Sequence, residues 1–413
     1  MHVSLLEVLR CPFCGTRPNL IDNPALVRTG DRIDWGVLGC ECCAYPVIDG
    51  VPVLIADDAT RDAMHAMEAG RREEALHALL GLDSARAEAF EALRSGPGGG
   101  TFGEAMQVLS PDPEGTYFLY RFSDPTFVLA ESLLRAVAQH SPVMAGRALD
   151  LCGGSGHLTR VIGQLGPAGG TVLADVFFWK LWLAKTFTAP DCTPVCCDAN
   201  NPLPFARASF SLVVLSDAFP YIWHKRMLAD EMLRAAGPNG TVVMPHLHSS
   251  RGWNYSQGMT LNPESYAALF APLAPRLYSD ATLLEAAIAG AAVPLDTPIT
   301  PEALGDQPSC SLVAGRDARL FQPRVPVAPT AVTGELRVNP LYRVTHHDGR
   351  STLTLTFPNG EYEDEFGDCK RYLPATLDLP GDLRGAVAGD HAGIDVRSLR
   401  RARVLIDAPP RYC

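Results

Sequence analysis

The sequence lacks several features that would assign a chain to a class of protein at once. Its first residues, MHVSLLEVLRCP, contain no basic start followed by a long apolar core, so no signal peptide is expected. The most apolar later segment, ATLLEAAIAGAAVPL, is too short to span a bilayer and carries Glu285. The chain also has no excess of positive charge, because its formal net charge is −11. These absences disfavour a protein that binds mainly to nucleic-acid phosphates, and they predict a cytoplasmic protein without membrane contact.

The length of the chain indicates more than one domain. At 413 residues it is too long for one small domain, and 47% hydrophobic and 20% charged residues are ordinary for a globular protein. The sequence shows no internal repeat and does not indicate an oligomeric state. Shifts in composition divide it into four segments, residues 1–56, 57–118, 119–322 and 323–413.

The cysteines are concentrated at the N-terminal end, where five of the twelve lie within the first 43 residues. In a reducing compartment, two Cys-x-x-Cys pairs separated by 25 residues are more often metal ligands than disulfides. They predict one tetrahedral zinc on four thiolates, which is structural because no position is left open for a substrate. The predicted ligands are Cys11, Cys14, Cys40 and Cys43, with Cys42 as the alternative to Cys40 or Cys43. Buried thiols without metal are the other interpretation.

This N-terminal segment resembles a known family. The pattern LLEVLRCPFC…GCECCAYPVIDGVPVLI, over about residues 4–55, is similar to the small zinc-ribbon proteins that act as activating partners of tRNA, rRNA and protein methyltransferases. Its most specific piece is the aromatic-Pro-x-x-Asp-Gly-x-Pro run from Tyr45 to Pro52. The resemblance implies a zinc ribbon over residues 1–56.

The segment that follows the ribbon is predicted to be mostly helical. Residues 58–94 are Ala-rich and charged with helical spacing, which predicts two helices broken near Gly81. The Gly/Pro-rich stretch 95–117 predicts a loop, and a further helix is expected over residues 125–140. The second segment is therefore expected to connect the ribbon to the next domain.

The two remaining segments differ in their strand patterns. From residue 147 to about 322, strands alternate with helices, which is typical of a doubly wound α/β domain. From residue 323 onward, the period-two run STLTLTF and the turn signals HDGR and PNGE predict a small β-rich appendage.

A glycine-rich turn opens the α/β domain. The stretch RALDLCGGSGHLTR predicts a strand ending at Asp150, a turn with Gly153, Gly154 and Gly156, and the start of a helix, which aims backbone N–H groups at a ligand. The dinucleotide fingerprint is incomplete, because Thr159 stands where its third glycine would be. The turn instead resembles the first motif of the class I S-adenosylmethionine-dependent methyltransferases, Asp-x-Gly-x-Gly-x-Gly, with Cys152 in place of the first glycine.

The resemblance continues over about residues 145–250 and implies a Rossmann-like fold that binds S-adenosylmethionine. It places Asp175 at the ribose hydroxyls and Asp198, with Ala199, near the adenine amino group. Arg121, beside Tyr120, would pair with the methionine carboxylate. From the residues alone, Asp198 has a second interpretation as a turn former, and Arg121 has one as part of an ordinary surface ion pair. The full set of expected cofactor residues is Asp150, Gly153, Gly154, Gly156, Asp175, Asp198, Ala199, Ser216, Tyr120 and Arg121.

The acceptor of the methyl group should lie beyond the carboxyl ends of the strands. In MPHLHSS, period two puts His246 and His248 on one side, just after a strand that Pro245 is expected to end, and histidine titrates near neutrality as a base must. Asp217, at the end of another strand, and His224 are the further catalytic candidates. The histidines have three other interpretations: they hydrogen-bond the substrate, they pack in the core, or they bind a metal as a pair. The other interpretation of Asp217 is that it caps the next helix.

Two functions follow from this sequence. The first is a methyltransferase that acts on a small molecule, such as a natural product, sugar or lipid precursor, by in-line displacement at an oxygen with a histidine as base. The acidic charge and the C-terminal appendage favour it. The alternative is an rRNA or tRNA methyltransferase, which the kinship of the zinc ribbon favours. An inactive cofactor-binding scaffold is the third interpretation, and the intact set of acidic residues argues against it.

Overall fold

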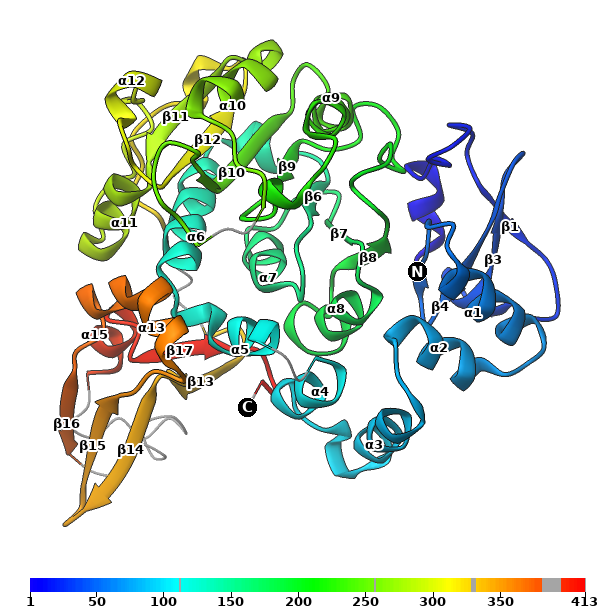
Figure 1. Cartoon of the computed structure of the whole chain (residues 1–413), viewed down its shortest axis with the longest axis horizontal. Helices are drawn as coiled ribbons and strands as arrows, with labels where there is room; N and C mark the ends of the chain where they lie inside the picture. Colours follow the sequence, from blue (N-terminus) through cyan, green and yellow to red (C-terminus); the bar gives the residue numbers. More distant parts are fainter. Residues whose placement is uncertain (111–112, 256–257, 328–331, 381–394, 413) are drawn as a thin grey trace.

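The computed structural model describes residues 1–110, 113–255, 258–327, 332–380 and 395–412. The N-terminal segment lies on one side of a central α/β unit, and the C-terminal strands lie at another corner (Figure 1). No helix within the described ranges is both long and apolar enough to cross a bilayer.

The N-terminal module is a small antiparallel sheet preceded by a 3-10 turn at Val3–Glu7. The strand order is β1-β3-β4-β5, with β2 paired to β3. A tight turn joins β4 to β5, because Asp49 and Gly50 both adopt positive φ angles of 48° and 75°. The strands are β1 (Asn19–Ile21), β2 (Val27–Thr29), β3 (Arg32–Gly39), β4 (Ala44–Ile48) and β5 (Val51–Pro52).

The second segment is more helical than the sequence predicts. Gly81 ends a helix in the left-handed conformation, as expected, but a further break at Gly70 gives three helices over residues 58–95 instead of two. The predicted loop over residues 95–117 also contains helices, because Thr101 and Glu104 form a reciprocal capping box that starts α4. The helices are α1 (Asp58–Glu68), α2 (Arg72–Leu80), α3 (Ser84–Ser95), α4 (Phe102–Leu109) and α5 (Pro113–Tyr120).

The central unit is a seven-stranded sheet of order β11-β12-β10-β9-β6-β7-β8. The strands β8, β7, β6, β9 and β10 are parallel, so their carboxyl ends share one edge, while β12 runs antiparallel to both β10 and β11. The strands are β6 (Ala148–Leu151), β7 (Thr171–Asp175), β8 (Thr193–Cys196), β9 (Leu212–Val214), β10 (Thr241–His248), β11 (Pro275–Ser279) and β12 (Ser309–Ala314).

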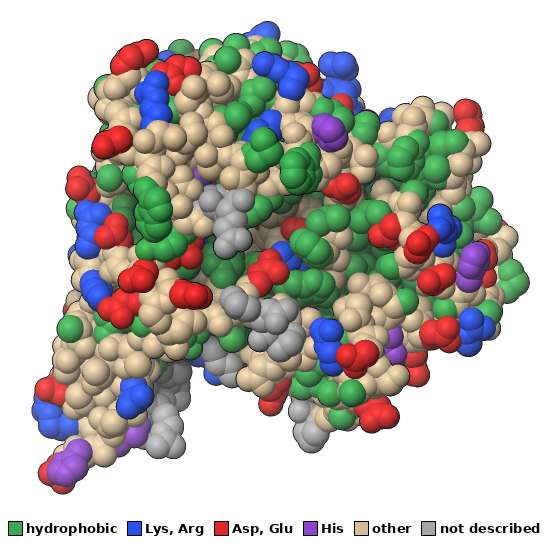
Figure 2. Space-filling model, viewed as in Figure 1, with side chains coloured by type: hydrophobic (Ala, Val, Ile, Leu, Met, Phe, Trp, Pro, Cys, Tyr) green, Lys and Arg blue, Asp and Glu red, His purple; other side chains and the backbone are tan. Residues whose placement is uncertain are grey.

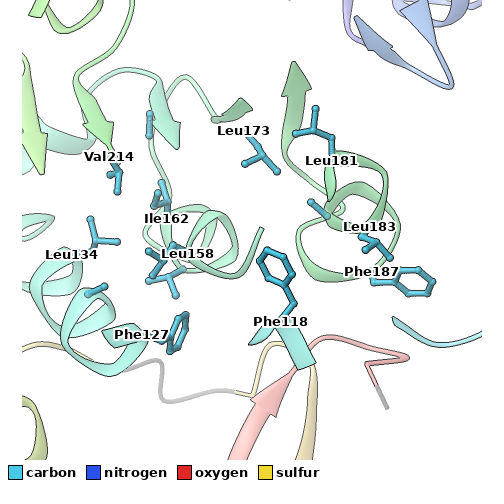
Figure 3. Packing of buried hydrophobic residues seen from close by; sticks show 14 of the residues in the cluster. Phe118, Phe127, Leu134, Leu158, Ile162, Leu173, Leu181, Leu183, Phe187 and Val214 are labelled. Carbon is cyan, nitrogen blue, oxygen red and sulfur yellow. The ribbon is translucent and has the colours of Figure 1, made fainter. Parts of the chain in front are cut away.

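Helices cover both faces of this sheet because its strands are apolar on both sides. Along β7, Leu173 packs with one buried cluster and Val172 with another, and Val214 and Val213 of β9 divide in the same way. Figure 3 shows the first cluster, in which side chains of α7 meet Leu173 and Val214. The helices of this unit are α6 (Pro125–Val137), α7 (His157–Gln164), α8 (Phe178–Leu183), α9 (Lys225–Ala236), α10 (Pro263–Leu269), α11 (Asp280–Ala289) and α12 (Pro301–Leu304).

The N-terminal module docks on the β8 edge of this sheet. The Leu54 N–H donates to the Cys196 carbonyl at 2.8 Å, and Val53 forms a parallel bridge with Cys196. On the other side of the contact, the Ala206 N–H donates to the carbonyl of Val8 at 2.7 Å. The module therefore extends the sheet and covers an edge whose backbone groups would otherwise be exposed.

The C-terminal segment forms two small sheets, β13-β17 and β14-β15-β16, as the period-two runs predict. The HDGR turn is present, with positive φ at Asp348 and Gly349, whereas PNGE starts a helix because the Asn359 side chain caps it. The stretches 328–331 and 381–394 and residue 413 of the predicted appendage lie outside the described residues. Its elements are β13 (Glu335–Val338), β14 (Tyr342–His347), β15 (Arg350–Leu355), α13 (Gly360–Phe366), β16 (Thr376–Pro380), α15 (Val396–Arg401) and β17 (Leu405–Ala408).

Candidate active site

The turn between β6 and α7 has a backbone that admits almost no side chains. Gly154 and Gly156 have φ angles of 56° and 84°. A Cβ on Gly153 would lie 2.5 Å from Leu173 and 2.6 Å from the Asp150 carboxylate, so only glycine fits there. Cys152 also has a φ of 56°, which costs an L-residue about 1–2 kcal/mol and accounts for the glycine usual at this place in the motif.

Asp150 lies beneath this turn and is 1% exposed. Its Oδ2 accepts a hydrogen bond of 2.6 Å from the Thr159 hydroxyl on α7. Burial raises the pKa of Asp150 to about 7, against the opposing effect of that hydrogen bond. The carboxyl group therefore ties the end of β6 to the first turn of α7 and holds the loop in place.

Asp175 ends β7 beside the same turn. One of its carboxylate oxygens accepts from the Gly154 N–H at 3.0 Å and the other from the Phe177 N–H at 2.9 Å. Burial raises the pKa of Asp175, although the nearby Lys180 ammonium opposes the shift. A carboxylate fixed at the end of a strand and next to a glycine turn fits a ligand that offers two adjacent hydroxyl groups.

The remaining expected cofactor residues differ in how well they fit. The Ser216 hydroxyl, just after β9, is buried and has no hydrogen-bond partner among the described residues, so its hydrogen-bonding capacity is unused. Asp198 is occupied by a turn, because it accepts from the Asn200 N–H at 2.8 Å and from Asn201 Nδ2 at 3.1 Å. Ala199 is buried within that turn.

The segment α5 and the residues after it lie over the glycine turn. The ring of Phe118 lies only 3.0 Å from where a Cβ of Gly154 would be. Arg121 is buried, and its Nη1 donates to both Asp124 oxygens at 2.7 and 2.6 Å and to the Thr126 hydroxyl at 2.6 Å. The ion pair of Arg121 with Asp124 is therefore buried and not at the surface. These bonds use only Nη1 and do not involve Nη2 or Nε.

Tyr117, three residues before the predicted cofactor residue Tyr120, reaches the carboxyl edge of the sheet. Its hydroxyl donates to Asp217 Oδ2 at 3.4 Å, and its ring lies 5.0 Å from the Arg121 guanidinium carbon. Tyr120 instead packs against Tyr362 of α13, with ring centroids 5.5 Å apart. Tyr117 therefore contacts a predicted catalytic residue.

Three of the four catalytic candidates form what we call the Asp–His–His cluster, Asp217, His246 and His248. Asp217 Oδ1 lies 2.8 Å from His248 Nε2, and the two imidazole rings are 4.7 Å apart. Burial would raise the pKa of Asp217, but the hydrogen bond to His248 and the nearby histidines hold it below its usual value. Burial lowers the pKa of His246, and the hydrogen bond to Asp280 and the charge of Asp217 outweigh that effect and raise it.

A β-bulge brings the two histidines together. The register of β10 against β12 shifts between Met244 and Leu247, and His246 has a φ of 56°. The expectation that Pro245 ends the strand is therefore wrong, because β10 continues to His248 across the bulge. Bulges of this kind re-aim side chains beside functional sites.

His224 does not join the cluster. It is exposed and precedes α9, where it lines a surface hollow of about 740 Å³ with Asn200, Asn201 and Trp223. His224 was a candidate because it follows the strand that ends near Asp217. The residues between that strand and His224 are irregular, so their number does not predict where the His224 side chain lies.

Asp280 is a site residue that the sequence did not reveal. It accepts at 2.9 Å from His246 Nδ1 and at 2.6 Å from the Ser311 hydroxyl. Asp280 begins α11, where an acidic residue is ordinary, and it reaches His246 only because β11, β12 and β10 are neighbours. No local pattern could have indicated this contact.

The N-terminal module gathers four thiols, those of Cys11, Cys14, Cys40 and Cys42. Cys42 Sγ lies 3.6 Å from Cys11 Sγ and 3.9 Å from Cys40 Sγ, and Cys14 Sγ lies 3.8 Å from Cys40 Sγ. Zinc–sulfur bonds of about 2.3 Å in a tetrahedron require sulfurs about 3.8 Å apart, so the set fits one zinc ion.

The structure places Cys42, and not the predicted Cys43, in this set. The backbone of Cys43 is paired with Cys40, because the Cys40 N–H donates to the Cys43 carbonyl at 2.9 Å and the Cys43 N–H donates to Cys40 Sγ at 3.2 Å. This pairing makes Cys43 the closing residue of the turn and leaves Cys42 at its tip. Sequence spacing alone does not distinguish the two.

The comparisons with known proteins agree with this geometry. The sequence pattern of the family described as "Methyltransferase domain" matches residues 149–244. At the N-terminal end the chain is 32% identical over 74 residues to a UPF0434 protein of Aliivibrio fischeri, which covers 98% of that protein and 18% of this chain. The protein is an S-adenosylmethionine-dependent methyltransferase. Its first segment belongs to the UPF0434 family.

The chain also matches a second relative of its first segment and a solved structure. A UPF0434 protein of Ralstonia pickettii is 38% identical over 60 residues, covering 81% of that protein and 14% of the methyltransferase. The structure of an S-adenosylmethionine-dependent methyltransferase from Thermotoga maritima covers 52% of the chain and all of its own length, at 13% identity and a TM-score of 0.34. The relatives and the cysteine set together identify the N-terminal module as a zinc ribbon.

We expect Asp175→Ala to weaken the binding of S-adenosylhomocysteine to this methyltransferase by roughly 30-fold or more. The change removes an acceptor of two charge-assisted hydrogen bonds, worth about 2 kcal/mol together. Titration calorimetry measures the effect, with Asp191→Ala as a control because Asp191 is exposed and follows in the same segment of chain. An unchanged affinity in Asp175→Ala would show that Asp175 does not hold the ribose.

Proposed function

We propose that this methyltransferase transfers a methyl group to a hydroxyl oxygen of a small molecule, such as a natural product, sugar or lipid precursor. The observation that carries the proposal is the Asp–His–His cluster at the carboxyl edge of the sheet, beside the cofactor turn. Bound S-adenosylmethionine supplies an electrophilic methyl group on a sulfonium sulfur. The chain must then hold the acceptor in line with that methyl group and assist the loss of its proton.

The residues present fit S-adenosylmethionine. Gly153 lets the turn pack directly against Leu173 and Asp150, Asp175 offers a carboxylate at the strand end, and the buried Ser216 hydroxyl lacks a partner among the described residues. In this proposal Asp150 orients the loop and Arg121 approaches the methionine carboxylate. The zinc of the ribbon is structural, because its four thiolates leave no open position.

The surroundings of the cluster support a small acceptor. Tyr117 of α5 covers Asp217, and Phe366 of α13 packs 6.0 Å from the Tyr117 ring, so helices from two other segments lie over the cluster. Glu365 of α13 is close enough to interact with the charges of Asp217 and His246. On the face in Figure 2, Lys and Arg side chains are scattered among acidic ones and form no continuous basic band. An acidic, partly covered site suits a neutral or cationic small molecule better than a polyphosphate chain.

Radiolabelled S-adenosylmethionine tests the acceptor class. The protein is incubated with the small-molecule fraction of a cell extract and, separately, with total RNA from the same cells. We expect label in small molecules extractable into organic solvent or retained on a sugar-binding column, and none in RNA that nuclease releases. Asp175→Ala serves as the inactive control. Label in RNA alone would replace this proposal by the RNA methyltransferase alternative.

A further inference from the structure

We propose that the Asp–His–His cluster binds a divalent first-row transition-metal ion, which holds an acceptor that offers two neighbouring oxygens. This inference rests on the proposed function for the role of the ion but not for its binding. One ligand atom from each of Asp217, His246 and His248 lies within 4.8 Å of the other two. Two imidazoles and one carboxylate that leave positions open are a recurrent site for such metals, whereas magnesium and calcium prefer oxygen ligands alone.

The groups around the cluster are arranged as metal sites require. Asp280 accepts from His246 Nδ1 and is itself fixed by the Ser311 hydroxyl, so Nε2 is the nitrogen left for a ligand. A carboxylate behind a histidine in this way orients the ring and fixes its tautomer. Tyr117 donates to the Asp217 oxygen that does not face His248, which orients the carboxylate in the same manner.

Two features of the cluster favour a bound cation. His248 Nδ1 is buried and has no hydrogen-bond partner among the described residues. The side chains of Asp217 and Asp280 are 22% and 9% exposed, so two carboxylates share a largely covered space with two imidazoles. Buried charges of this kind are paired or coordinate metals, and a divalent cation would balance both carboxylates.

The backbone at the cluster is also held in an uncommon conformation. Asp217 and His246 have φ angles of 60° and 56°, the left-handed region that side chains other than glycine seldom adopt. Strain at two of three converging side chains is typical of a preorganised site. The bulge in β10 and the turn after β9 therefore aim these groups at one point.

The ion would act on the acceptor as a Lewis acid. A hydroxyl oxygen bound to it loses its proton to solvent more readily, and a second oxygen of the same molecule fills another open position. The new C–O bond forms from the resulting alkoxide as the C–S bond breaks, and the bonding electron pair stays on sulfur. The products are a methyl ether, S-adenosylhomocysteine and one released proton. The acceptor class is thus a vicinal diol or a catechol.

Manganese binding tests the site directly. Mn²⁺ does not compete with zinc for four thiolates, because it binds soft sulfur ligands more weakly than zinc does. The whole chain, purified with its zinc and washed with a mild chelator, is titrated with Mn²⁺ and followed by electron paramagnetic resonance. We expect one Mn²⁺ per chain and nitrogen couplings from two imidazoles in the spin-echo spectrum. Absence of binding, or binding without imidazole couplings, would overturn the site.

Variants locate the ion on these residues. We expect Asp217→Asn and His248→Asn to weaken Mn²⁺ binding by about 100-fold or more, and Asp280→Asn, which acts through His246, by about 10- to 100-fold. His65→Asn on the exposed face of α1 is the matched control and should bind as the wild type does. Each variant must retain S-adenosylhomocysteine binding, which shows that it is folded. Unchanged Mn²⁺ affinity in folded variants would overturn the assignment.

Methyl transfer separates this inference from the proposed function. We expect transfer to the small-molecule fraction to fall on chelation and to return with Mn²⁺. Transfer that is unaffected when the chelator has removed the ion would refute its role and leave the small-molecule function intact. Mn²⁺ bound with imidazole couplings but no labelled small molecule would support the metal site and overturn the function instead.

Discussion

Cys11→Ser should remove the zinc and unfold the ribbon. A zinc ion on four thiolates contributes about 10–16 kcal/mol to the folding of modules of this size, which bury too little core to fold without it. Cys11 is 2% exposed and faces Cys42 at 3.6 Å, so the serine leaves one thiolate fewer at a closed site. Metal analysis should find one tightly held zinc per wild-type chain and almost none in the variant. Limited proteolysis should then cut within residues 1–56.

Two adjacent cysteines give this prediction a matched control. Cys42→Ser should lose zinc as Cys11→Ser does, whereas Cys43→Ser should keep it, because Cys43 lies outside the gathered set. Loss of zinc in Cys43→Ser alone would restore the ligand set that the sequence suggests. A wild-type chain that folds normally without zinc would contradict the structural role of the metal. The ribbon covers the β8 edge, so we also expect the zinc-free variants to aggregate through that edge.

The cofactor side of the site could be predicted because its residues are local to the glycine turn or follow the next strand. The turn residues Gly153 to Gly156 follow directly from the spacing of strand and helix patterns. Asp175 ends the next buried strand, and parallel strands bring such ends to one edge. The same rule explains why Asp217, His246 and His248 meet. They follow or end the parallel strands β9 and β10, which are neighbours in the sheet.

The missed features depend on contacts that no local pattern records. Asp280 reaches His246 through the antiparallel pairing of β11 with β12, and Tyr117 reaches Asp217 across 100 residues of chain. The helices α4 and α5 were not predicted, because Gly and Pro residues surround them. A capping box such as that of α4 is a weaker sequence signal than a cluster of helix breakers. The choice between Cys42 and Cys43 depends on one turn and its backbone pairing, which ligand spacing does not fix.

We expect His246→Asn to lower methyl transfer by about 10²- to 10⁴-fold while S-adenosylhomocysteine binds nearly as tightly as before. The asparagine cannot present Nε2, either to the acceptor or to a metal ion that holds the acceptor, and the Asp280 carboxylate loses the imidazole that it orients. Cofactor affinity should not change, because the cofactor residues Asp150 and Asp175 lie on β6 and β7 and do not bond to His246. The measurement compares the rate of label transfer with calorimetric affinity in the same preparation.

His224→Asn is the comparison that gives this result its meaning. His224 is exposed and lines a different hollow, so its loss should leave both rate and affinity close to those of the wild type. If His224→Asn abolished transfer and His246→Asn did not, the acceptor would bind at that hollow and the cluster would be structural. Asp280→Asn adds a second discrimination, because it keeps His246 in place and removes only its orienting charge. A loss in Asp280→Asn smaller than that in His246→Asn, with cofactor affinity unchanged in both, is the order expected when Asp280 acts through the imidazole.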